Sequence, residues 1–110
     1  MPTTNSFSLE GNVVDVIAGK IFAGEIRVQD GKIAAIIEKP IQNSCFIMPG
    51  LVDAHVHIES SMLLPSEFAR LAVAHGTVAS VSDPHEIGNV LGVDGVKFMI
   101  ANGAKVPFKF

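Results

Sequence analysis

Short stretches in which hydrophobic and polar residues alternate dominate the first half of the chain. In Glu25–Asp30 apolar residues recur at every second position, which is the period of a half-buried strand. The pattern also predicts a strand over Asn12–Ile17 and a returning strand over Lys32–Lys39, with Asp30-Gly31 as the hairpin turn. These segments predict a small antiparallel sheet.

The second half begins with a long apolar segment, Cys45–His57, that is polar only at its end. Such a run is typical of a strand in a parallel sheet that is covered on both faces. A helix is predicted next, with Pro65 at its first position and Gly76 just after its end. The face predicted to be buried carries Phe68, Leu71, Ala72 and His75, at helical spacing.

Three further elements are predicted toward the end of the chain. Thr77–Ser82 reads as a strand, the segment from Asp94 to Gly103 as a helix with Asp94 as its cap, and residues 105–110 as the opening of another strand. The resulting order of strand, helix, strand, helix and strand implies parallel pairing with right-handed crossovers. The fold class is therefore α/β.

Composition and charge narrow the class of protein. The chain has 110 residues, of which 48% are hydrophobic and 17% charged, so we expect one ordered domain by length. No apolar run approaches the ~20 residues of a membrane-spanning helix, and the first residues lack the pattern of a signal peptide. We therefore expect a cytoplasmic protein that does not bind membranes.

Nucleic acid is not an expected partner. The net charge is −3, basic residues are scattered, and Trp and Tyr are absent, which leaves neither a basic face nor a stacking platform. Cys45 is the only cysteine, so there is no intramolecular disulfide and no paired-cysteine zinc site. We expect Cys45 to be a small buried hydrophobic residue.

Two histidines stand at the polar end of the apolar segment. His55 and His57 are two positions apart, so in a strand their side chains project to the same face. Two neutral imidazoles at the end of a strand can bind one metal ion such as Zn, Fe or Mn. The alternative is a pair of histidines without a metal, but the position at a strand end favours the metal.

The next strand ends in a second group of polar residues, Asp83-Pro84-His85-Glu86. Because successive parallel strands present their ends at the same edge, Asp83, His85 and Glu86 are candidates for contacts with substrate or with an accessory metal. A polar loop in which Asp83 caps backbone amides is the alternative. The spacing does not assign their separate roles.

Glu59, Ser60 and Ser61 follow the histidine pair directly. Glu59 and Ser60 are candidates for substrate or accessory-metal contacts, or for support of the histidines; tying down the first loop is an equal alternative. His75 ends a predicted helix, where we expect a structural role.

The segments "FIMPGLVDAHVHIESSM" and "HGTVASVSDPHEIGNVLG" resemble the metal-dependent amidohydrolases, and within them the adenine deaminase family. The resemblance implies a (β/α)₈ TIM-type barrel preceded by strands of a small β-sandwich. Residues 1–48 would then be the sandwich strands, and residues 49–110 the first βα units of the barrel.

The resemblance also implies the chemistry. Members of the family hydrolyse adenine to hypoxanthine and ammonia with a metal-activated water, and hold a pair of divalent ions, manganese or iron, with zinc as a further candidate. His55 and His57 would bind the first metal, and His85 and Glu86 would line the substrate pocket or hold an accessory metal. Adenine is thus the implied small-molecule partner, and a homo-oligomer is expected.

The ligands that such enzymes take from later strands do not occur in this sequence, and a complete barrel takes about 250 residues. We therefore expect a fragment of a longer enzyme that is poorly stable and inactive by itself, and we assign it no catalytic residue. The alternatives are another cyclic amidohydrolase and a non-catalytic, metal-binding fragment.

Overall fold

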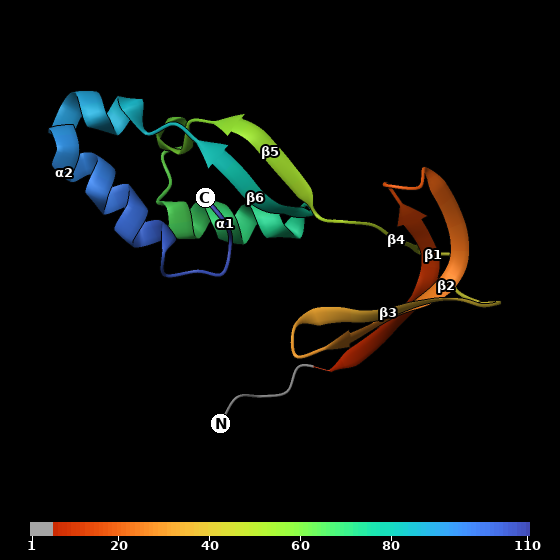
Figure 1. Cartoon of the computed structure of the whole chain (residues 1–110). Coiled ribbons are helices and arrows are strands. Elements are labelled where there is room, and N and C mark those ends of the chain that lie inside the picture. Colours follow the sequence, from red (N-terminus) through yellow and green to blue (C-terminus); the bar gives the residue numbers. More distant parts are fainter. Residues whose placement is uncertain (1–5) are drawn as a thin grey trace. The chain divides into compact units, whose positions relative to one another are not determined.

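A computed structural model describes residues 6–110 and divides the chain into two compact units, Met1–Pro49 and Gly50–Phe110. The first unit is a four-stranded sheet with the strand order β3-β2-β1-β4 (Figure 1). Its strands are β1 (Phe7–Asp15), β2 (Lys20–Gln29), β3 (Lys32–Glu38) and β4 (Phe46–Ile47). Val13 and Ile26 form its buried apolar centre.

The turn between β2 and β3 confirms the predicted hairpin. Asp30 and Gly31 both have positive φ angles, 51° and 72°, and Gln29 pairs with Lys32 across them. Glycine and aspartate tolerate this left-handed conformation, and the two-residue turn matches the twist of the strands that it joins. The antiparallel pairs β1–β2 and β2–β3 are as predicted, although β1 and β2 begin earlier than the alternating pattern indicated.

The predicted single strand over Cys45–His57 is wrong. The segment forms two strands: β4 pairs in parallel with β1, whereas β5 (Leu51–Val56) belongs to the second unit. Pro49, which cannot donate to a strand ladder, stands between them. Gly50 follows it at a close approach, since a Cβ there would lie 2.5 Å from a side-chain carbon of Val78.

Cys45 is exposed, so the prediction of a buried thiol is wrong. It directly precedes β4, and its backbone is fixed by two hydrogen bonds. The Cys45 amide donates to Oδ1 of Asn43, and its carbonyl accepts from the amide of Asn12.

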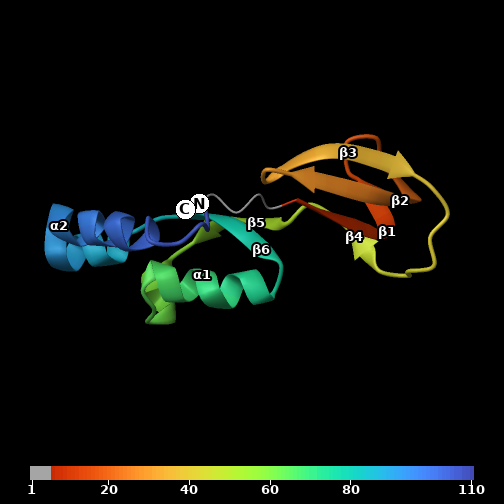
Figure 2. The ribbon, with the colours of Figure 1, turned by 90° about the horizontal axis from the view of Figure 1, so that it is seen from below.

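The second unit is a βα arrangement. It contains β5, the short 3₁₀ helix η1 (Ile58–Ser61), α1 (Pro65–Ala74), β6 (Thr77–Ser82) and α2 (His85–Gly103). β5 and β6 pair in parallel, as predicted, and α1 lies along one face of this pair (Figures 1 and 2). A parallel pair needs such a crossover helix because the second strand must start at the same end as the first.

The predicted buried faces of β5 and α1 need correction. Leu51 and Val52 of β5 are 52% and 62% exposed, because β6 is its one strand neighbour within residues 6–110. On α1 the buried residues are Pro65 and Ala69, whereas Leu71 is 49% exposed. The small core of the unit consists of Ile58, Ala69, Met99 and Phe108.

Helix α2 begins at His85 rather than at Asp94, so the "DPHE" segment enters its first turn. Gly92, with φ 61° and ψ −148°, interrupts the helix, which is why the sequence pattern suggested only its second part. The predicted third strand is reduced to a single parallel bridge between Lys109 and Ala79 of β6. Within the described residues, no helix is both long and apolar enough to cross a membrane.

Candidate metal centre

The two histidines at the end of β5 point to the same place, as their spacing predicts. Nε2 of His55 lies 3.0 Å from Nε2 of His57. His57 follows β5 with extended backbone angles, φ −100° and ψ 98°, so the alternation of the strand continues through it. Both side chains therefore leave the same face of the strand.

The backbone directly after β6 sets the proton position on His57. The strand pairing continues past the end of β6, where the Asp83 amide donates to the carbonyl of Val56. The Asp83 carbonyl in turn lies 3.0 Å from Nδ1 of His57. A carbonyl oxygen only accepts, so Nδ1 carries the proton and the neutral ring keeps its lone pair on Nε2.

This arrangement fits a divalent metal. A second-sphere carbonyl on one ring nitrogen is the usual way to direct the other nitrogen at a metal. Two nitrogens bound to one ion at about 2.1 Å lie roughly 3.0–3.4 Å apart, close to the separation of the two Nε2 atoms. The space between them is filled either by a proton of His55 or by a cation that both rings share.

Three residues that follow β6 complete two groups of metal-ligating side chains. One group is His55, His57 and Asp83, the other is His57, His85 and Glu86, and within each the ligand atoms lie within 4.8 Å of one another. The rings of His57 and His85 meet edge to face at 4.6 Å. The structure thus brings the residues of both strand ends together, with His57 common to the two groups.

Asp83 and His85 form an ion pair within the site when His85 is protonated. Nδ1 of His85 lies 3.1 Å from Oδ2 of Asp83. This hydrogen bond is the main cause that holds the pKa of the Asp83 carboxyl below its ordinary value, against partial desolvation. Asp83 therefore stays an anion at neutral pH and contributes negative charge next to the imidazoles.

The side chains of Glu59 and Ser60 bond to α2, whereas the Ser60 amide donates to the His57 carbonyl at 3.2 Å. Oε1 of Glu59 accepts a hydrogen bond from the Ile87 amide, and Oγ of Ser60 donates to Oε1 of Glu86 at 2.7 Å. Ser61 bonds to the Ile58 carbonyl and stays within the loop. His75 caps the end of α1, is exposed, and belongs to neither group of metal-ligating residues.

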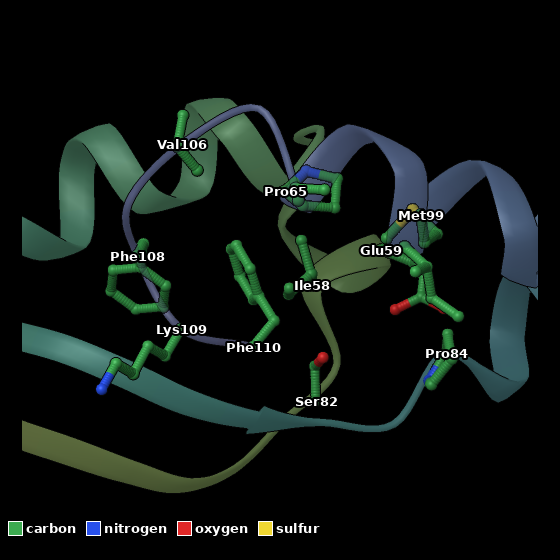
Figure 3. A pocket seen from close by; sticks show the side chains of 13 residues that line it. Ile58, Glu59, Pro65, Ser82, Pro84, Met99, Val106, Phe108, Lys109 and Phe110 are labelled. Carbon is green, nitrogen blue, oxygen red and sulfur yellow. The ribbon is translucent and has the colours of Figure 1, made fainter.

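A cavity of about 660 Å³ lies beside the site, within the second unit (Figure 3). Its walls are mainly apolar and include Ile58, Met99, Phe108 and Phe110, while Glu59 stands at one end beside Met99 and Pro84. No motif in the sequence indicates that these residues line a cavity. Sequence reasoning also missed the backbone carbonyl of Asp83, because a main-chain group leaves no trace in the residue type.

A parallel βα arrangement with paired histidines at the end of its first strand is typical of metal-dependent hydrolases. Residues 46–110 match the profile of the Amidohydrolase family, and the chain belongs to that family. The matched range begins at β4 and includes every residue of both candidate ligand groups.

Individual relatives are more specific. The chain is 58% identical to an adenine deaminase of Sulfurovum sp. over 93% of its length, and 59% identical to that of Methanosarcina mazei over 90%. It is 50% identical to an adenine deaminase of Borreliella burgdorferi over 94%. These alignments cover 19%, 18% and 19% of the relatives, so the chain spans about a fifth of their length.

Proposed function

We propose that the full-length protein containing this chain is an adenine deaminase, which converts adenine and water into hypoxanthine and ammonia. The convergence of His55 and His57 at 3.0 Å, beside Asp83, His85 and Glu86, carries the proposal. The curated relatives named adenine deaminase support this choice of substrate among cyclic amidines.

His55 and His57 would hold a divalent ion, manganese or iron, with zinc as the third candidate, and a second ion would complete a binuclear site. When bound, such an ion lowers the pKa of a water molecule toward neutrality and so supplies a nucleophile. The chain's own part is to orient the imidazoles. The Asp83 carbonyl holds the proton of His57 on Nδ1, and the Asp83 carboxylate supplies negative charge beside the rings.

Asp83, His85, Glu86, Glu59 and Ser60 are proposed to surround the substrate or an accessory metal. Support comes from their position at the ends of β5 and β6, the edge at which a barrel gathers its reactive groups. We further propose that residues 1–48 are strands of a flanking β-sandwich, and residues 49–110 the first βα units of a (β/α)₈ barrel. A homo-oligomer and a cytoplasmic location stay predictions.

Adenine turnover by the full-length protein tests this function. The ultraviolet change from adenine to hypoxanthine is followed in buffer that contains Mn²⁺, with the double variant His55→Asn, His57→Asn as control. We expect turnover by the native protein and none by the variant. A folded, metal-loaded protein without adenine turnover would leave another cyclic amidohydrolase or a non-catalytic metal protein as the answer.

A further inference from the structure

Neither helix of the second unit has a capping side chain at its own start. The residues at the N-cap positions are Leu64 before α1 and Pro84 before α2, and neither side chain has an oxygen. The first-turn amides of a helix nevertheless need acceptors. In α2 the acceptor comes from elsewhere in the chain, since Oε1 of Glu59 lies 3.2 Å from the Ile87 nitrogen.

The partner that Glu59 engages is the turn that carries two of the candidate ligands. His85 and Glu86 are the first residues of α2, directly before Ile87. The carboxylate also faces the positive end of the helix dipole, which favours an anion there. The neighbouring Ser60 donates to Glu86, so two consecutive residues of η1 hold this turn.

Glu59 is half-buried, and one of its carboxylate oxygens is turned away from solvent. Its Oε2 atom is buried and has no hydrogen-bond partner within residues 6–110, and its side chain lies against the cavity beside Met99 and Pro84 (Figure 3). A carboxylate loses hydration in such a place, and the Ile87 amide with the helix dipole offsets part of that loss. One oxygen of Glu59, Oε1, thus caps the start of α2.

We propose that Glu59 is a positioning residue, which fixes the first turn of α2 so that His85 and Glu86 stay next to His57. The edge-to-face contact of the His57 and His85 rings at 4.6 Å depends on where this turn lies. The inference rests on the proposed metal site but not on the proposed substrate. Glu59 acts through α2 and need not touch an ion.

The test compares Glu59→Ala and Glu59→Gln in the full-length protein, with Glu67→Ala as matched control. Glu67 also lies in the first turn of a helix, but its side chain is 50% exposed and pairs with the exposed Arg70. Amide exchange of α2 is measured without metal, and Co²⁺ binding is titrated through its visible absorption. These readouts require no turnover of adenine.

We expect Glu59→Ala to speed exchange of the Ile87 amide about tenfold and to weaken Co²⁺ binding by about 10- to 100-fold. Glu59→Gln keeps an acceptor oxygen and should restore most of both properties, while Glu67→Ala changes neither. Unchanged exchange at Ile87, faster exchange spread evenly over the protein, or a Gln variant as defective as Ala would each overturn the proposal. Absent adenine turnover would overturn only the proposed function.

Discussion

Nδ1 of His57 donates a hydrogen bond to the backbone carbonyl of Asp83, 3.0 Å away. This contact joins the residue after β5 to the residue after β6. It exists because the parallel pairing of the two strands continues through the Asp83 amide and the Val56 carbonyl. The proton on His57 is therefore placed by the fold, and the lone pair stays on Nε2, which faces Nε2 of His55.

Replacing His57 should abolish tight metal binding. His57 belongs to both groups of candidate ligands, so His57→Asn removes a donor from each, and we expect Mn²⁺ affinity to fall by about 100-fold or more. The measurement is metal content after dialysis, together with a titration. His75→Asn is the control, because His75 lies in neither group; equal loss in both variants would contradict the assignment.

Asn102 of α2 should stabilise α1 by capping its first turn. The residue is 5% exposed, and its Oδ1 accepts a hydrogen bond from the Ser66 amide in the first turn of α1. Asn102→Ala removes this cap and should cost about 1 kcal/mol of stability. Chemical denaturation measures the loss, and amide exchange at Ser66 locates it. Asn89→Ala, at an exposed position of the same helix, should have little effect.

Two glycines of α2 should respond to alanine with opposite signs. Gly92 has φ 61° and ψ −148°, so a side chain there is strained and Gly92→Ala should destabilise by about 1–3 kcal/mol. At Gly88 an added Cβ meets Val96 at an ordinary 3.5 Å, so Gly88→Ala should stabilise by about 0.5–1 kcal/mol. Amide exchange across α2 reports both. Equal effects would show that the kink at Gly92 is not required.

The first unit should lose stability in acid through Glu25. This buried carboxylate accepts hydrogen bonds from Arg27 and Lys39, which together lower its pKa from 4.5 to about 2. A lowered folded-state pKa gives stability that is complete above pH 4.5 and is lost as the pH falls toward 2.

Denaturation or amide exchange of β1–β3 between those pH values measures this loss. Glu25→Gln should be less stable at neutral pH and should flatten the pH dependence. Glu38→Gln is the control, since Glu38 makes none of the side-chain hydrogen bonds found within residues 6–110. A Glu25→Gln protein with the native acid profile would assign the acid sensitivity to another group.

Local patterns of the sequence determined much of the fold. The alternation of residues and the Asp30-Gly31 signal specify β2, β3 and their turn, because strand period and turn conformation depend on neighbouring residues alone. For the same reason the two-residue spacing of His55 and His57 sufficed to place both rings on one face. The apolar character of residues 45–57 did not separate β4 from β5, since both strands are apolar and pair with different partners on either side of Pro49.

The tertiary structure alone decided how these groups meet. The His57–Asp83, Glu59–Ile87 and Asn102–Ser66 contacts join residues 26, 28 and 36 positions apart. Such contacts arise only once β5 and β6 pair in parallel and the helices have packed, so no local pattern encodes them. The order of residues along the chain specifies which chemical groups stand at the strand ends. Long-range packing decided the tautomer of His57 and the place of the turn that carries His85 and Glu86.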